Sequence, residues 1–94
     1  MYKELFSLGE LYFTGGVHNE IMCNPVFAEF VQNSLSRYIK GDWGDLCKED
    51  KEQNKLSLRE GFQLLSVYKN HKHEVWIITE ADRLTTTILF PDEY

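Results

Sequence analysis

Three β-forming runs in the last third of the chain limit the folds available to it. They are residues 62–68 (FQLLSVY), 74–79 (EVWIIT) and 85–90 (TTTILF), separated by the turns 69–73 and 80–84. Such short connections require antiparallel pairing, because a parallel connection needs a dozen residues or more. Pro91, which has no N–H, is expected to end the third run. The sequence therefore predicts an antiparallel meander.

Helical signals occupy most of the chain before these runs. Asn24-Pro25 is typical of an N-cap followed by proline at the first helical position, and Gly41 is expected to end that helix. Its apolar stripe comprises Phe27, Phe30, Val31, Leu35, Tyr38 and Ile39. A short helix is predicted over residues 17–22, after Gly15-Gly16.

The spacing predicts a second long helix from Trp43 to about Glu60, capped by Asp42. Its inward positions are Trp43, Leu46, Cys47, Asp50, Asn54 and Leu58. Residues 9–14 (GELYFT) alternate like a strand and are expected to pair at one sheet edge. These patterns predict one α+β domain over residues 1–94. Its antiparallel three- to four-stranded sheet is covered on one face by two main helices, with Trp43 and Trp76 as structural anchors.

The charge balance bears on the kind of partner. The 94 residues carry 15 acidic and 10 basic side chains, a net charge of -5. This charge repels nucleic-acid phosphates and favours another protein as the partner. Without a long apolar run or a signal-like N-terminus, we expect a cytoplasmic protein with no membrane contact. A monomer and a homodimer both remain open, since an edge strand carrying Tyr12 could pair across a twofold axis.

The cysteines and histidines indicate neither a disulfide framework nor a metal site. Cys23 and Cys47 are expected to pack as small hydrophobic residues in a reducing compartment. His71 and His73 form an H-x-H in a predicted turn, with no C-x-x-C to complete a zinc site. We expect no metal and no cofactor.

Asp50 and Asn54 are candidate site residues because they interrupt the apolar side of the predicted second helix. Buried polar groups need hydrogen-bond partners, and Arg83 is the candidate partner for Asp50. One interpretation is an internal polar network that joins this helix to the sheet. The other is a binding cleft formed by Asp50, Asn54, Glu80, Asp82 and Arg83.

A catalytic alternative starts from the acidic stretch that contains Asp42, Asp45, Glu49 and Asp50. Such density suggests Mg²⁺ and a small nuclease, although helical spacing places only the first three on one side. A capped, solvated helix start also accounts for it. No catalytic residue is assigned.

Four motifs are the most specific pieces of the chain: Gly41-Asp42-Trp43-Gly44, Glu49-Asp50 with Asn54, Thr79-Glu80-Ala81-Asp82-Arg83 and Pro91-Asp92-Glu93-Tyr94. Together they resemble one family, the short bacterial mobile-element proteins known as plasmid-related proteins, some of which bear a type I restriction subunit name. The chain departs from the family at Thr14-Gly15-Gly16-Val17, where members have Thr-Pro-Gly-Ala, and at Tyr38, where they tend to have histidine. The restriction name has no support in the residues, because no cofactor-binding glycine loop is present.

The resemblance implies a setting in plasmids, phages and integrative elements, which carry small proteins that disarm host defences. Combined with the acidic charge, it leads to the hypothesis of a non-enzymatic protein-binding module. The expected partner is a host defence nuclease, inhibited in the manner of an anti-CRISPR or antirestriction protein. The alternative is a small metal-dependent nuclease or toxin-like enzyme that uses Asp50, Glu80, Asp82 and Arg83.

Overall fold

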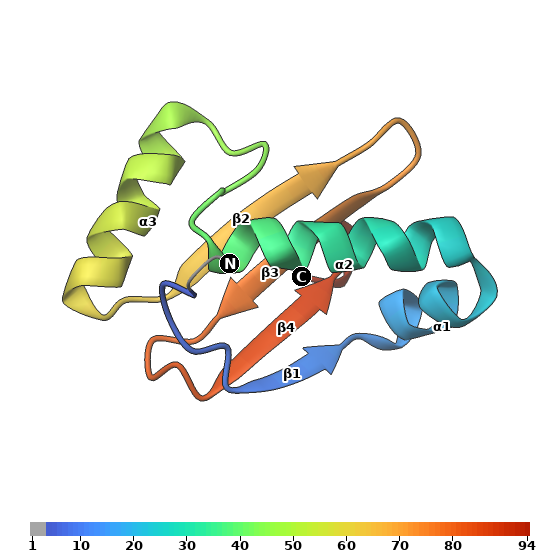
Figure 1. Ribbon diagram of the computed structural model, residues 1–94, viewed down its shortest axis with the longest axis horizontal. Helices are drawn as coiled ribbons and strands as arrows, with labels where there is room; N and C mark the ends of the chain where they lie inside the picture. The colour runs from blue at the N-terminus through green and yellow to red at the C-terminus, as the bar shows by residue number, and fades with distance from the viewer. Residues whose placement is uncertain (1–3) are drawn as a thin grey trace.

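The computed structural model describes residues 4–94 and has the predicted α+β class (Figure 1). Its strands are β1 (Glu10–Phe13), β2 (Leu64–Lys69), β3 (Glu74–Thr79) and β4 (Thr85–Leu89). Its helices are α1 (Gly15–Cys23), α2 (Pro25–Ile39) and α3 (Lys48–Glu60), with a final 3₁₀ turn, η1 (Pro91–Glu93).

The predicted meander is confirmed, but the sheet as a whole is mixed. The strand order is β1-β4-β3-β2, and β2, β3 and β4 pair antiparallel in sequence. β1 pairs in parallel with β4, with Leu11 opposite Thr86. A parallel pair needs a long connection, which the three helices and two strands between β1 and β4 provide. The expectation of a purely antiparallel sheet was therefore wrong.

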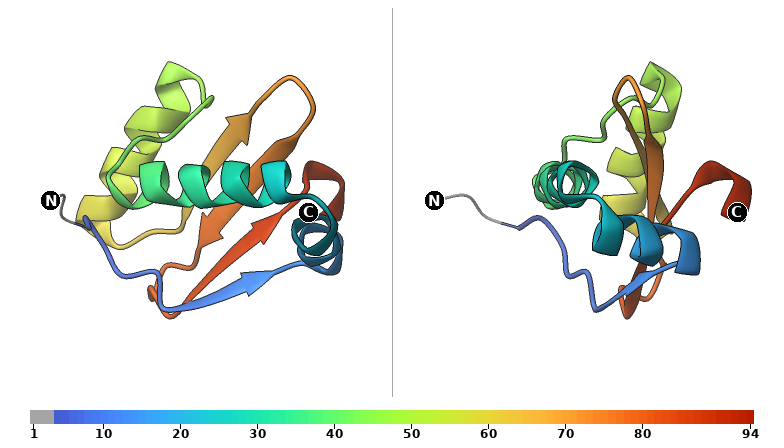
Figure 2. Two further views of the ribbon diagram at one scale, coloured as in Figure 1. Left: turned by 45° about the vertical axis from the view of Figure 1, so that its right-hand side comes forward. Right: turned by 90° about the vertical axis from the view of Figure 1, so that its right-hand side faces the viewer.

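α2 begins and packs as its sequence predicts. The Asn24 side chain accepts hydrogen bonds from the N–H groups of Val26 and Phe27, at 3.1 and 3.2 Å. Phe27, Val31 and Tyr38 from its apolar stripe join the main core cluster. α2 therefore covers one face of the sheet (Figure 2).

α3 differs from the prediction in both its start and its position. It begins at Lys48, and the N-cap residue, Cys47, makes no side-chain capping hydrogen bond. Residues 40–47 form a loop. The helix flanks the β2 edge beside the sheet, whereas α2 lies over one face (Figures 1 and 2). α2 is thus the main cover, and among the elements of residues 4–94 η1 lies on the opposite side of the sheet (Figure 2).

Candidate binding surface

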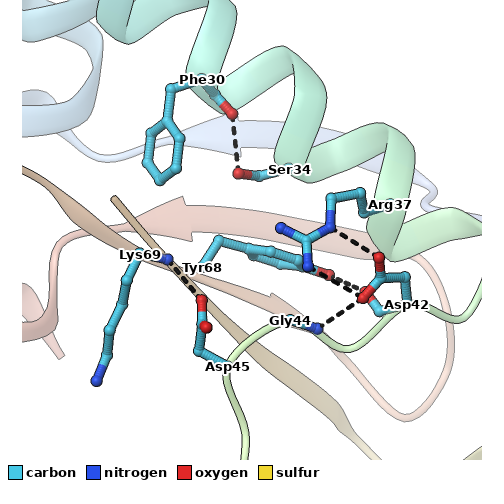
Figure 3. Close-up of polar contacts among 8 residues, drawn as sticks. All are labelled: Phe30, Ser34, Arg37, Asp42, Gly44, Asp45, Tyr68 and Lys69. Carbon is cyan, nitrogen blue, oxygen red and sulfur yellow. Dashed lines mark hydrogen bonds and ion pairs between the residues drawn. The ribbon is translucent and has the colours of Figure 1, made fainter. Parts of the chain in front are cut away.

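The loop at residues 40–47 connects α2 to α3 and contacts the edge strand β2, and Asp42 organises it (Figure 3). The Asp42 carboxylate accepts from Arg37 Nε at 2.8 Å, Arg37 Nη2 at 3.2 Å and the Gly44 N–H at 3.1 Å. The Arg37 hydrogen bond is the main reason that the pKa of Asp42 lies below its ordinary value. Arg37 also lies over the Tyr68 ring, 5.1 Å from its centre, and the Tyr68 hydroxyl donates to the Asp42 carbonyl at 2.7 Å.

Gly44 is required where the loop meets β2. Its φ is +71°, and an added Cβ would lie 2.2 Å from the Val67 carbonyl oxygen. Glycine alone combines this left-handed conformation with such a close approach. Within the Gly41-Asp42-Trp43-Gly44 motif, Asp42 and Gly44 therefore have structural roles in this loop.

The outer edge of β2 is closed by side chains as well as by backbone. The Asp45 N–H donates to the Val67 carbonyl at 2.7 Å, and the Asp45 carboxylate accepts from the Lys69 N–H at 2.9 Å. The Asn54 amide donates to the Leu65 carbonyl at 2.7 Å and accepts from the Leu65 N–H at 3.3 Å. Asn54 thus reproduces the pairing that a neighbouring strand would supply.

Asn54 and Asp50 have different environments, although the sequence suggested one for both. Asn54 is 3% exposed and fully engaged, as expected of a buried polar residue. Asp50 is exposed, and no hydrogen bond joins it to Arg83 within the described residues 4–94. The prediction that Asp50 is buried was wrong, because the helix flanks an edge and its N-terminal end meets solvent. Asp50 instead lines a hollow of about 290 Å³ with Leu46, Gln53, Asn54, Gln63 and Leu65.

Arg83 stabilises the 80–84 turn through backbone carbonyls. Its guanidinium donates to the carbonyls of Phe62, Glu80, Ala81 and Ser57, at 2.7 to 3.3 Å. The Ser57 carbonyl lies in the last turn of α3, where a cation is also favoured by the helix dipole. Arg83 holds a left-handed φ of +62°, which these contacts offset.

The acidic residues of the 80–84 turn have separate local roles. Asp82 accepts from the Leu84 N–H at 2.9 Å, and Glu80 accepts from the Gln63 side chain at 3.5 Å. Among the hydrogen bonds of the described chain, none joins the side chain of one of Asp50, Glu80, Asp82 and Arg83 to the side chain of another. The proposed Asp50–Arg83 contact is therefore absent from the described structure.

The two predicted anchor tryptophans lie in different surroundings. Trp43 is 5% exposed and packs against the rings of Phe6 and Tyr38, at 6.2 and 5.7 Å between centres. Trp76 is half-buried on the face away from α2, and its ring centre lies 5.4 Å from that of Tyr94. The Trp76 indole N–H donates to the Glu74 carboxylate at 2.9 Å. Trp43 is a core residue, whereas Trp76 belongs to a surface.

Sequence reasoning missed a chain of buried hydroxyl groups beneath α2. The Tyr38 hydroxyl meets Thr79 Oγ1 at 2.7 Å, Thr79 meets Thr86 at 2.8 Å, and Thr86 donates to the Leu8 carbonyl at 2.7 Å. Because a carbonyl only accepts, the donors run from Tyr38 to Thr79 to Thr86. Burial raises the pKa of Tyr38, which keeps this donor protonated. The sequence signal that could have revealed this chain is the presence of threonine at inward-facing positions of two paired strands, Thr79 and Thr86.

The face of the sheet away from α2 is largely apolar and acidic at its margin. Strand alternation places on it Tyr12, Leu65, Val67, Trp76, Ile78, Thr85, Thr87 and Leu89. Tyr12 is 49% exposed. The carboxylates at its margin belong to Glu10, Asp50, Glu74 and Glu80, and the lysine at the end of β2 is Lys69. We call this set the open face.

The cysteines and histidines make no cluster in the described part of the chain. Cys23 and Cys47 are both exposed, so the expectation that they pack inside was wrong. His73 packs on Phe27 at 4.6 Å between ring centres. Residues 4–94 contain no group of three or more His, Cys, Asp or Glu side chains able to hold a metal ion. Within the same residues, no helix has the length and apolar character that crossing a membrane requires.

Comparison with known proteins adds no relative. The chain matches no protein-family model, no curated protein and no solved structure.

Proposed function

We propose that this chain is a protein-binding module that docks through the open face onto a partner with a basic surface. The observation that carries the proposal is the combination on one face of an exposed aromatic side chain, Tyr12, and the half-buried Leu65, Val67 and Trp76 with carboxylates at the margin. Aromatic side chains supply most of the binding energy at protein interfaces, and complementary charge at the margin steers association.

The partner class to test first is a host defence nuclease, whose substrate channel must be basic to hold nucleic acid. An acidic chain from a mobile element would then inhibit the nuclease by occupying that channel, as an anti-CRISPR or antirestriction protein does. The resemblance to plasmid-related proteins and the net charge of -5 support this choice. The proposal places the protein in the cytoplasm, where such nucleases act.

The test is a nuclease inhibition assay with matched variants. The purified chain is titrated into several purified defence nucleases, and cleavage of DNA or RNA is followed. We expect a saturating loss of cleavage at about one chain per nuclease site. Because charge contributes, the apparent affinity should fall as salt rises.

Thr87→Arg is the interface variant, because Thr87 is half-buried on the open face between Tyr12 and Ile78. Gln32→Arg is the matched control, because Gln32 is exposed on α2, on the other side of the sheet. We expect Thr87→Arg to weaken inhibition at least about tenfold, a loss of about 1.4 kcal/mol, while Gln32→Arg does not. Equal effects of the two variants contradict the assignment of the open face. Magnesium-dependent cleavage by the chain alone contradicts the binding role and favours the enzyme alternative.

A further inference from the structure

The two edge strands of the sheet differ in whether their outward backbone groups are hydrogen-bonded. At the β2 edge, Asn54 pairs with the backbone of Leu65, and Asp45 pairs with Val67 and Lys69. At the other edge lies β1, whose four residues are all exposed. No other described segment runs along the outer side of β1 (Figures 1 and 2). Exposed apolar edge strands are sites of pairing with another strand, and proteins normally block them.

The backbone groups that β1 leaves open can be identified from its pairing with β4. The N–H groups of Glu10 and Thr14 donate to the carbonyls of Leu84 and Ile88, at 2.9 and 3.1 Å. Because backbone groups alternate along a strand, the N–H and C=O groups of Leu11 and Phe13 point outward. Among the loop, turn and side-chain hydrogen bonds of the described chain, none involves these two residues.

We propose that β1 pairs antiparallel with β1 of a second copy, across a twofold axis at Tyr12. In this register Leu11 faces Phe13 of the other copy, and these two pairs exchange about four backbone hydrogen bonds. Tyr12 faces its own equivalent in a non-hydrogen-bonded pair, where side chains lie closest.

The choice of a second copy rests on the self-complementarity of residues 10–14. Apolar residues face apolar residues at Leu11, Tyr12 and Phe13, which are 36%, 49% and 40% exposed in the single chain. The single charged residue of this segment, Glu10, faces Thr14 of the other copy, so Glu10 does not lie opposite its own equivalent. The Thr14 hydroxyl donates to the Glu93 carboxylate at 2.6 Å. A closed twofold contact uses the same patch on both copies, and this short segment fits itself in that way.

Two solution experiments test the dimer. A ribbon of this size buries less than a standard interface, so association in the micromolar range is expected. Light scattering on the intact chain at roughly 100 µM should therefore give twice the chain mass of 11.1 kDa. Tyr12→Lys places two cations on the axis and should weaken association at least about tenfold. Phe62→Lys is the matched control, because Phe62 is 50% exposed and lies outside β1; it should leave the dimer intact.

Disulfide trapping tests the register. In a Cys23→Ser, Cys47→Ser background, Tyr12→Cys places two thiols on residues about 4.5 Å apart between Cα atoms, within the range of a disulfide. Glu10→Cys places them about 14 Å apart, too far to bridge. We expect oxidation to link the Tyr12→Cys chain into dimers and to leave the Glu10→Cys chain monomeric.

Three outcomes would overturn the proposal: a monomer at every concentration, equal crosslinking of both cysteine variants, or dimers that survive Tyr12→Lys. A different protein strand that occupies β1 in a stoichiometric complex would also overturn it, because the occupant would not be a second copy. The β1 dimer is independent of the proposed function, because it requires no partner protein. It is tested by the molecular mass and by disulfide crosslinking alone.

Discussion

Replacement of Asn54 by alanine is the sharpest test of how the β2 edge is closed. The change removes the donor to the Leu65 carbonyl, at 2.7 Å, and the acceptor of the Leu65 N–H, at 3.3 Å. A buried backbone group that loses its partner costs about 1 to 3 kcal/mol. Leu65 lines the hollow beside α3, so water can hydrogen-bond its backbone once Asn54 is removed. The lower end of this range therefore applies to the Leu65 N–H and to the Leu65 carbonyl. We therefore expect Asn54→Ala to lower the free energy of unfolding by about 2 to 3 kcal/mol.

Asp50→Ala is the matched control, one helical turn earlier on α3. Asp50 is exposed, so its removal should change stability by less than about 0.5 kcal/mol. Both variants are measured by urea unfolding, followed through the fluorescence of Trp43 and Trp76. Equal losses for the two variants, or a negligible loss for Asn54→Ala, would refute the claim that Asn54 closes the edge.

Asn54→Asp separates hydrogen bonding from side-chain shape. The carboxylate keeps the acceptor for the Leu65 N–H but faces the Leu65 carbonyl without a donor. We expect a loss of about 3 kcal/mol at pH 7. This environment raises the pKa of the new carboxyl in the folded state. The loss should therefore be complete above that raised pKa and shrink as pH falls below it. A loss that does not change with pH contradicts this reasoning.

Two further predictions concern the 40–47 loop. Trp43→Ala should lower the free energy of unfolding by about 3 to 5 kcal/mol, because the indole is 5% exposed between Phe6 and Tyr38; an unchanged melting temperature would contradict its burial. The pKa of Asp42 is held below its ordinary 3.8 mainly by Arg37, so its stabilisation is present above about pH 4 and is lost as pH falls through the lowered value. The side chains of Arg37 and Asp42 are both about half exposed, so Asp42→Asn should lower the free energy of unfolding by only about 0.5 to 1 kcal/mol at pH 7. The variant should also lose less stability than the unmodified chain as the pH is lowered below about 4. An equal loss in the two proteins would contradict the Arg37–Asp42 pairing.

The elements that could be predicted from the sequence are those with local causes. Asn24-Pro25 starts α2 through a side-chain cap and a proline that both act within one turn. The strand over residues 74–79 has its predicted bounds, and β2 and β4 lie within two residues of theirs, because turn residues delimit them. Gly61 ends α3 in the left-handed conformation typical of a helix terminus.

The errors arise where tertiary partners override a local signal. Asp42 is a good helix cap by type, yet Arg37 and Gly44 engage its carboxylate, and α3 starts at Lys48, five residues after the predicted start at Trp43. The parallel pairing of β1 with β4 depends on where the helices bring the chain back, which no local pattern encodes. Asp50 and Asn54 share a helical spacing, and only the position of α3 beside an edge separates the buried residue from the exposed one.

The difference between the two sheet edges connects the site to the proposed dimer. A twofold axis at Tyr12 runs perpendicular to the sheet, so it keeps the open faces of both copies on the same side. The dimer would then present one continuous sheet with its apolar surface doubled, and a partner with two equivalent sites would bind it more tightly than it binds one copy. Tyr12→Lys should therefore weaken binding to a two-site partner more than to a single-site one. Equal weakening would show that β1 pairing does not contribute to recognition.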